Sequence, residues 1–230
     1  MSEFRRVHHQ LIQRALAHFS VPFLARNRVL FGGGTRISMD LDEFRESVDI
    51  DLLCPDKTAY RAVRETVTNR QLGDLVVEEF EYVRDIRFDR YGVRTFIRCG
   101  DTPIKLEIIN CDDYALTAGS LASVPVPVLS RESCLMTKLL ANADRGLSPP
   151  FKDIIDLLAM IRAWGPVPSQ SWYHAEEIYG AVVRRSFKSS LHYVVDHADE
   201  VKKEALGMGI VPDFADDLIE SARKLAASTT

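Results

Sequence analysis

The pattern of apolar and polar positions along the chain first predicts an N-terminal helix. Apolar residues recur at helical spacing from Phe4 to Phe19, which is typical of an amphipathic helix with one buried stripe. Pro22 follows the end of this pattern. His8 and His9 lie on the same helix without the spacing of metal ligands, so we expect both at its surface.

Short apolar runs bounded by turn-forming residues then predict a sheet. Val29–Phe31 and Val48–Leu53 are predicted to be neighbouring strands, and Pro55 ends the second. Further runs rich in Val, Ile, Phe and Tyr predict more strands, and good helix formers predict a helix. These elements are a helix over residues 57–70 and strands over Leu75–Val83, Gly92–Cys99 and Pro103–Asn110, with hairpin turn chemistry at Gly100-Asp101.

The pattern changes near residue 128, after which apolar positions keep a helical period. Pro125 and Pro127 mark a linker, so we place a domain boundary there, with domains over residues 1–128 and 129–230. The second domain is therefore predicted to be helical. Its helices carry apolar stripes over residues 135–143 and 154–161 and continue over Trp172–Phe187, Leu191–Ala205 and Phe214–Ala227.

Composition narrows the kinds of protein that this chain can be. With 230 residues, of which 46% are hydrophobic, it can bury one large core or two modest ones. The formal net charge of −4 excludes a general basic field, so a nucleic-acid site would have to be a local basic patch. No apolar run reaches the length needed to span a membrane.

The N-terminal pattern and the cysteines indicate a compartment. The N-terminal pattern is amphipathic, which differs from the uniformly apolar core of a signal peptide. The cysteines have neither a CxxC pair nor histidines at ligand spacing, which argues against a zinc site. We therefore expect a soluble cytoplasmic protein with reduced thiols and no membrane association. The cysteines are Cys54, Cys99, Cys111 and Cys134.

Two aspartates stand at alternate positions of an otherwise apolar run. In a strand, Asp49 and Asp51 would share one face, roughly 6 to 7 Å apart, while Val48 and its apolar neighbours would share the other. Like charges so close raise each other's pKa unless a cation lies between them. Mg²⁺ suits that role, because it prefers oxygen ligands and often binds carboxylates together with phosphates. The alternative is an exposed strand face that carries two acids.

The run Gly32-Gly33-Gly34 leaves the backbone without side chains ahead of these acids. The ordinary use of such a run is a turn between a strand and a helix. The second interpretation is a phosphate cradle, because N–H groups without a neighbouring Cβ can approach an anion and a helix that starts there adds a favourable dipole. The run is neither a Walker A loop nor a GxGxxG dinucleotide motif.

Together, the glycines and aspartates resemble the nucleotidyltransferase superfamily. Gly33-Gly34-Thr35, followed by the segment Arg45–Asp51, is similar to its AbiEii/AbiGii-type toxins of type IV toxin–antitoxin systems. Lys138 on one helix and Lys152–Leu157 on the next extend the resemblance. It implies an α+β fold, in which a polymerase β-like mixed sheet with flanking helices is followed by a helical C-terminal domain that completes the active-site cleft.

The resemblance also implies roles for individual residues. Asp49 and Asp51 would hold one or two Mg²⁺ ions, with Mn²⁺ as an alternative, and Glu107 would be a third carboxylate. Lys138, expected off the apolar stripe of its helix, would be free to reach a phosphate. The implied catalytic residues are Asp49, Asp51, Glu107, Lys138 and Asp156, and the implied nucleotide-binding residues are Gly33, Gly34, Thr35, Ser47, Lys138 and Asp153.

Three of these residues have simpler explanations as well. Glu107 could belong to a charged pair on an exposed strand face. Asp153 and Asp156 are neighbours on a helix and would repel each other mildly unless a cation lies close. Acids in the first turn of a helix also complement its N-terminus, which here follows Pro149-Pro150.

The function implied by the resemblance is transfer of a nucleotide from an NTP to an RNA acceptor, expected to be the tRNA 3′ end, with release of pyrophosphate. Such tRNA modification would inhibit translation, and a cognate antitoxin would be encoded alongside. Two alternatives stay open. One is transfer to a hydroxyl of a small molecule, as in antibiotic-modifying nucleotidyltransferases, and the other is nucleotide binding without catalysis.

Overall fold

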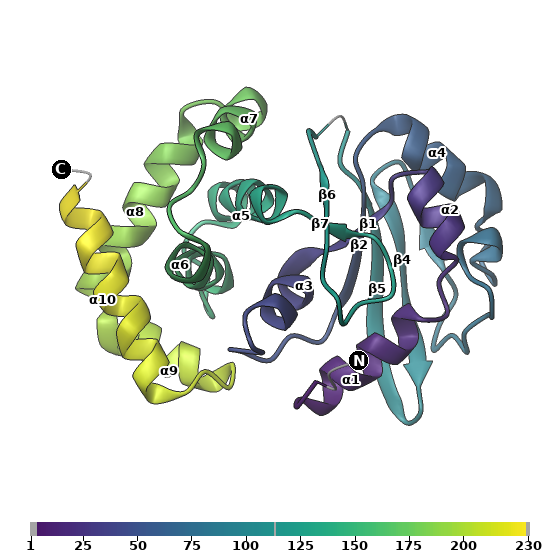
Figure 1. Ribbon diagram of the computed structural model, residues 1–230, viewed down its shortest axis with the longest axis horizontal. Helices are drawn as coiled ribbons and strands as arrows, with labels where there is room; N and C mark the ends of the chain where they lie inside the picture. The colour runs from purple at the N-terminus through teal and green to yellow at the C-terminus, as the bar shows by residue number, and fades with distance from the viewer. Residues whose placement is uncertain (1–3, 113, 229–230) are drawn as a thin grey trace. The chain divides into compact units, whose positions relative to one another are not determined.

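The structure, a computed structural model, describes residues 4–112 and 114–228 of the chain (Figure 1). By their internal contacts these residues form two compact units. The first, called the sheet unit, runs to Glu43 and again from Ser47 to Ser130. The second, called the helical unit, comprises Phe44–Glu46 and the chain from Arg131 onward. The short segment Phe44–Glu46 therefore packs with helices that come much later in the sequence.

The sheet unit contains a mixed seven-stranded sheet with the strand order β3-β4-β5-β2-β1-β7-β6. β2 runs parallel to β5 and β1 runs parallel to β7, whereas the other neighbours are antiparallel. Across β1 and β2, Gly32 pairs with Asp51. The strands are β1 Leu30–Gly32, β2 Ile50–Cys54, β3 Arg87–Phe88, β4 Gly92–Cys99, β5 Thr102–Asn110, β6 Ala118–Gly119 and β7 Val128–Leu129.

One face of the sheet is buried and the other is half-exposed. Side chains alternate between the two faces of a strand, so Ile50 and Leu52 are fully buried while Asp51 between them is partly exposed. β4 and β5 show the same alternation. The buried face shares one core with apolar residues of α1 (Val7–Leu16), α2 (Val21–Arg26) and α4 (Lys57–Thr66), which cover it (Figure 1).

Helix α3 (Gly33–Asp40) begins at the residue after β1 ends. Gly33 has a φ of +68°, in the left-handed region that favours glycine. Arg36 of this helix is fully buried, with Nε donating to the carbonyl of Leu129 at 3.0 Å and Nη1 lying 2.8 Å from Oδ2 of Asp40. A buried guanidinium needs such partners, so these contacts fix α3 against β7.

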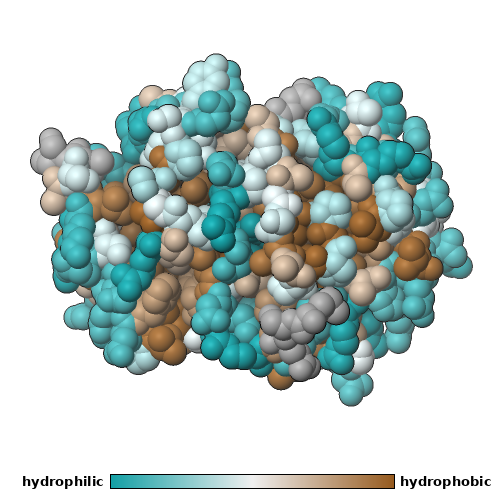
Figure 2. Space-filling model, in the orientation of Figure 1, coloured by the Kyte–Doolittle hydropathy of each residue, from teal (hydrophilic) through white to brown (hydrophobic). Residues whose placement is uncertain are grey.

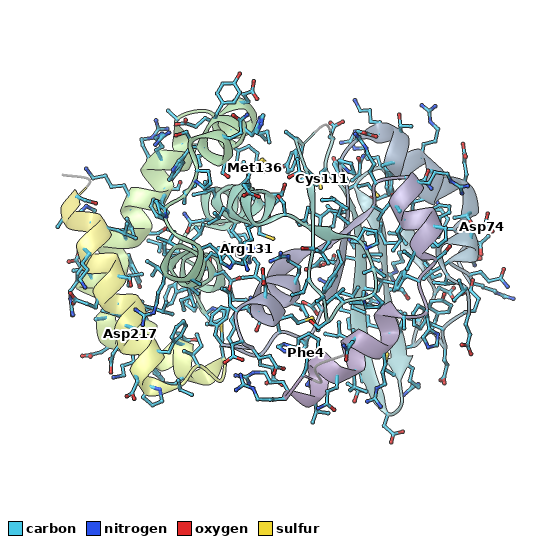
Figure 3. All side chains as sticks on the ribbon, in the orientation of Figure 1. Phe4, Asp74, Cys111, Arg131, Met136 and Asp217 are labelled. Atoms are coloured by element: carbon cyan, nitrogen blue, oxygen red, sulfur yellow. The ribbon has the colours of Figure 1, made fainter. Side chains whose placement is uncertain are left out.

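The helical unit is an assembly of amphipathic helices in which α5 packs against α6, α7 and α8. Figure 3 labels Arg131 and Met136 on α5, and Figure 2 shows hydrophilic residues over α10 at the left of the view. None of the described helices combines the length and the apolar character needed to cross a membrane. The helices are α5 Arg131–Arg145, α6 Lys152–Trp164, α7 Ser169–Tyr179, α8 Val182–Asp196, α9 Ala198–Gly207 and α10 Pro212–Ser228.

The structure confirms the strands that have the clearest sequence pattern. β4 and β5 form the predicted hairpin, in which Cys99 pairs with Thr102 and Gly100 in the turn has a φ of +60°. The two strands predicted on either side of the glycine run are neighbours, as expected. Both results follow from local signals, because turn chemistry and alternation act over a few residues.

Three predicted elements are wrong. The strand expected over Leu75–Val83 is absent, and the described residues there form a 3₁₀ turn, η1 (Gly73–Leu75), and isolated bridges. The helix predicted over Trp172–Phe187 is broken at Gly180, whose φ of +65° cannot continue a helix. The next predicted helix is likewise interrupted at His197, so α8 and α9 are separate helices.

Two predicted exposures are also wrong. Val48 lies before β2 begins and is 40% exposed, so it does not join the buried face. His9 is fully buried, with Nδ1 lying 2.9 Å from Oε1 of Glu43. Glu43 also accepts the backbone N–H groups of Arg5 and Arg6. Burial would raise the pKa of Glu43, but these hydrogen bonds and His9 hold it below its usual range.

Candidate active site

The glycine run passes the aspartate strand at Gly33 and Asp51. A Cβ built on Gly33 would lie 1.9 Å from Oδ2 of Asp51, a separation that no side chain can adopt. Only glycine therefore lets the backbone turn lie so close to this carboxylate. The positive φ of Gly33 is a second reason for glycine at this position. The result is a bare stretch of backbone in contact with an acidic side chain.

The first turn of α3 adds N–H groups to this place. Gly33 and Gly34 open the helix, and the first N–H groups of a helix have no carbonyl partner within it. They also lie at the positive end of the helix dipole. Both glycines are half-buried, in contrast to the buried Thr35 and Arg36 that follow. A phosphate can bind to such a turn while a metal links it to a neighbouring carboxylate.

Thr35 joins α3 to the segment that precedes β2. Its hydroxyl donates to the backbone carbonyl of Asp49 at 2.6 Å and lies 2.9 Å from Oγ of Ser47. Thr35 is only 1% exposed. Its hydroxyl is therefore directed at the protein, where it holds the backbone at Asp49.

The two aspartates are both half-buried, but only one lies in a strand. Asp51 is the second residue of β2, whereas Asp49 precedes it. The expectation that alternation alone puts both carboxylates on one face assumes a strand that starts two residues earlier than β2 does. The backbone at Asp49 is held instead by its hydrogen bond with Thr35.

Glu107 lies beside Asp51 on the neighbouring strand. The two residues pair in register across β2 and β5, so their side chains project from the same face. The Glu107 carboxylate forms ion pairs with Lys105 and, at 3.4 Å, with Nε of Arg94. Within residues 4–112 and 114–228, no group of three or more His, Cys, Asp or Glu side chains could hold a metal ion. The two aspartates are the candidate metal donors, and Glu107 lies beside Asp51, where two cations already engage it.

The helical unit contains a buried group of charged residues, which we call the ionic cluster. Asp156, fully buried, accepts from Nε and Nη2 of Arg45 at 2.6 and 2.8 Å and lies 2.7 Å from Nζ of Lys138. Asp153 lies 2.9 Å from the same Nζ and accepts two hydrogen bonds from Arg145. The cluster consists of Arg45, Lys138, Arg145, Asp153 and Asp156.

The expectation that Lys138 is free to reach a phosphate is wrong. Lys138 is 8% exposed and its ammonium group binds two carboxylates. Burial would lower the pKa of Lys138, but Asp156 and Asp153 raise it. Burial would likewise raise the pKa of both aspartates, but the neighbouring cations hold it below the usual range. All five groups are therefore charged, with one positive charge in excess.

Two members of the ionic cluster are not among the predicted site residues. Arg45 lies within the segment that carries the resemblance, yet its partner is 111 positions later in the chain. No local spacing could connect Arg45 to Asp156. Arg145 has an ordinary local explanation, since a basic residue in the last turn of α5 complements the helix dipole. Its two bonds to Asp153 depend on how α5 and α6 pack.

The sequence profile of the nucleotidyl transferase AbiEii toxin family, from type IV toxin–antitoxin systems, matches residues 14–224. The chain belongs to this family. The match includes the glycine turn, both aspartates and the whole ionic cluster of this AbiEii protein. No curated protein matches the sequence.

Three solved structures are similar to this AbiEii protein. A protein from H. pylori, provisionally assigned as a nucleotidyltransferase, has a TM-score of 0.55 at 17% identity and covers 99% of this chain and 97% of its own. JHP933 from Helicobacter pylori has a TM-score of 0.46 at 18% identity and covers 96% of this chain and 94% of its own. Antibiotic-resistance factor ANT(2'')-Ia has a TM-score of 0.41 at 18% identity and covers 83% of this chain and 97% of its own. The first confirms the expected fold class, and none of the three bears on the acceptor.

Nucleotidyltransferases generally use divalent metal ions, and the residues of the sheet unit fit such an ion. Asp49 and Asp51 offer carboxylate oxygens, the ligands that Mg²⁺ and Mn²⁺ prefer. The Asp51 carboxylate occupies the space that a Cβ at Gly33 would fill, so it lies directly against the bare backbone of the turn. The donor set and the bare turn are thus consistent with a metal bound together with a phosphate.

Proposed function

We propose that this AbiEii protein is a metal-dependent nucleotidyltransferase that moves a nucleotide from an NTP to an RNA acceptor, the tRNA 3′ end, and releases pyrophosphate. The observation that carries the proposal is the contact between the glycine turn and Asp51, because such an enzyme needs a phosphate site next to a metal site. The family assignment supports the transfer chemistry and the role as a toxin.

Asp49 and Asp51 would hold one or two divalent cations, Mg²⁺ or Mn²⁺. A magnesium ion commonly binds one or two carboxylates together with substrate phosphates. When bound, such an ion stabilises charge on the attacking and leaving oxygens. β2 fixes the backbone at Asp51 and the hydrogen bond from Thr35 fixes it at Asp49, which supports a rigid pair of ligands.

The first turn of α3 would bind the β- and γ-phosphates of the NTP. Gly33 and Gly34 contribute N–H groups at the positive end of the helix dipole. Thr35 and Ser47 would act on the nucleotide indirectly, because the Thr35 hydroxyl already contacts Asp49 and Ser47. Both are positioning residues in this proposal.

Within the helical unit, the ionic cluster is proposed to contribute to nucleotide binding, as the family membership suggests. Its cations are Arg45, Lys138 and Arg145. Asp156 is fully buried and bonded to two cations, so we assign it the positioning of Lys138 rather than a catalytic step. Asp153 has the same role toward Lys138 and Arg145. The guanidinium of Arg145, at 60% exposure, is the most accessible cation of the cluster.

A proton must leave the acceptor hydroxyl when its oxygen attacks the α-phosphate. Asp51 would accept this proton, or Glu107, which pairs with it on the neighbouring strand. Arg94 and Lys105 hold Glu107 in place. A Glu107→Gln variant with nearly normal turnover would assign the proton to Asp51.

An enzyme with these substrates would act in the cytoplasm. Addition of nucleotides to the tRNA 3′ end would block aminoacylation and so inhibit translation. The type IV family implies that a cognate antitoxin counteracts this effect.

The test is transfer of label from an α-labelled NTP to total RNA by the wild type and by Asp51→Asn and Asp49→Ala. We expect acid-insoluble label with the wild type and a loss of at least about a hundredfold in both variants, because each removes a metal ligand. Sequencing of RNA 3′ ends then identifies the acceptor. Equal incorporation by all three proteins would refute the roles of the aspartates.

The same assay separates the alternatives. Acid-soluble labelled product would show a small hydroxyl acceptor. Metal-dependent NTP binding without release of pyrophosphate would show a protein that binds nucleotide without catalysis.

A further inference from the structure

The half-exposed face of the sheet carries a row of charged residues in register with Asp51. Strand pairing puts Asp51 opposite Glu107 and Glu107 opposite Arg94. Arg94 in turn lies opposite Arg87. Paired residues project from one face, so the row crosses four neighbouring strands. With about 4.8 Å between strands, Arg94 is roughly 10 Å and Arg87 roughly 14 Å from Asp51.

A second row lies beside the first on the same face. Two residues further along β4, Phe96 pairs with Lys105 of β5. The guanidinium of Arg84 lies over the Phe96 ring, 4.5 Å from its centroid. We call these residues the basic face: Arg84, Arg87, Arg94, Phe96 and Lys105.

The net charge of the basic face is opposite in sign to that of the whole chain. The basic face holds four Arg or Lys side chains, and with Glu107 and Asp51 of the same row the excess is two positive charges, whereas the chain has a net charge of −4. A local concentration of this kind is the electrostatic requirement for binding a polyanion. It lies in one stretch of sheet rather than being spread over the molecule.

Much of this positive charge is not neutralised within the protein. Arg94 and Lys105 share the Glu107 carboxylate, and Arg94 also contacts Asp89. Arg84 and Arg87 are exposed, and neither has a carboxylate partner among the described residues. Both are therefore available to an external anion.

The chemistry of the basic face fits RNA. Arginine pairs with phosphate oxygens in a planar, two-pronged arrangement, and bases of single-stranded RNA stack on aromatic rings and on guanidinium planes. The Arg84 and Phe96 pair offers both surfaces. An acidic protein would fit the arginines as well, but it has no base to stack on the Arg84 and Phe96 pair.

We propose that the basic face binds the phosphate backbone of the RNA acceptor and directs its 3′ end toward Asp51. The proposal rests on the proposed function, because it assumes that the acceptor hydroxyl reacts near Asp51. Arg87 would contact the backbone furthest from the reacting end, and Arg94 would contact it one strand nearer. Phe96 with Arg84 would stack on an unpaired base.

The test compares two double variants with the same change in charge. Arg84→Glu/Arg87→Glu alters the basic face, and Arg61→Glu/Arg70→Glu is the control. The control residues are also exposed and have no ion pair among the described residues, and Arg61 lies on α4, which covers the opposite face of the sheet. Circular dichroism establishes that both variants fold. Affinity for deacylated tRNA is then measured at several salt concentrations.

We expect the basic-face variant to bind tRNA at least about tenfold more weakly than the control. The slope of log affinity against log salt concentration should become shallower by roughly 0.7 to 0.9 for each phosphate that the variant no longer neutralises. Its KM for tRNA should rise while its KM for NTP stays unchanged. Equal tRNA affinity and equal slope in the two variants would overturn the inference. Unchanged tRNA binding with weakened binding of polyglutamate would assign the face to an acidic protein and also overturn it.

These outcomes are distinct from failure of the proposed function. If the wild type transfers no nucleotide, the function fails, while the tRNA affinities still decide whether the face binds RNA. If the wild type is active and the basic-face variant binds tRNA as the control does, only the inference fails.

Discussion

Oδ2 of Asp51 lies only 1.9 Å from the point that a Cβ on Gly33 would occupy. Because atoms cannot approach so closely, the turn and the carboxylate keep their present positions only while residue 33 has no side chain. The proposed phosphate site at the turn and the proposed metal site at the carboxylate would therefore both depend on one residue.

The first prediction concerns this contact. Gly33→Ala should displace Asp51 and lower nucleotide transfer by at least about a hundredfold, as expected when a catalytic group loses its position. Gly100→Ala is the matched control, since Gly100 also has a positive φ but has open space where a Cβ would be. In each variant the free energy of unfolding should fall by roughly 1 to 2 kcal/mol, because alanine must then adopt a left-handed backbone conformation. Equal transfer rates in the two variants would contradict the steric argument.

The second prediction concerns the ionic cluster. Arg45→Ala should lower the free energy of unfolding by about 3 to 5 kcal/mol, because it leaves the buried Asp156 carboxylate without its two-pronged partner. Arg162→Ala removes an arginine whose partner, Asp217 on α10 (Figure 3), is about half-exposed, so its cost should be below about 1 kcal/mol. Urea unfolding measures both values. Similar losses of unfolding free energy in the two variants would show that the buried Arg45–Asp156 pair stabilises the protein no more than the exposed pair does.

The third prediction concerns acid stability. Cations hold the pKa of Asp153 below its usual range although burial opposes this, so the unfolded state takes up the proton first as the pH falls. The stability that Asp153 contributes is therefore present above its unfolded pKa of about 3.9 and is lost below it. Comparison of the wild type with Asp153→Asn in urea at several pH values isolates this contribution. The difference in unfolding free energy should be constant near neutral pH and shrink below about pH 4. A difference that does not change with pH would contradict the prediction.

The fourth prediction concerns Thr35. Thr35→Val keeps the shape of the side chain but leaves the carbonyl of Asp49 without its hydroxyl donor, which should cost about 1 to 3 kcal/mol and lower kcat more than it changes the KM for NTP. Thr35→Ser retains the hydroxyl and should restore kcat. If Thr35 contacted a phosphate directly, Thr35→Val would instead mainly raise the KM for NTP.

Local signals in the sequence predicted much of the fold. The β4–β5 hairpin and the helices α5, α6 and α10 have strong periods or clear turn residues, and all are present. The two-residue strands β3, β6 and β7 are too short for any alternation to be visible. The segment Leu75–Val83 has strand composition, but it joins its neighbours by isolated bridges instead of a ladder.

The sequence by itself determined the glycine run, the strand that carries Asp51 and the membership of the AbiEii family, because all three are read from the order of residues along the chain. The tertiary structure decided that Thr35 holds Asp49, that Lys138 is buried between two acids, and that Arg87 and Arg94 line up with Asp51. These relationships join residues far apart in sequence. A hydrophobic period reports which face of an element is buried, but it does not report which charged side chain meets which.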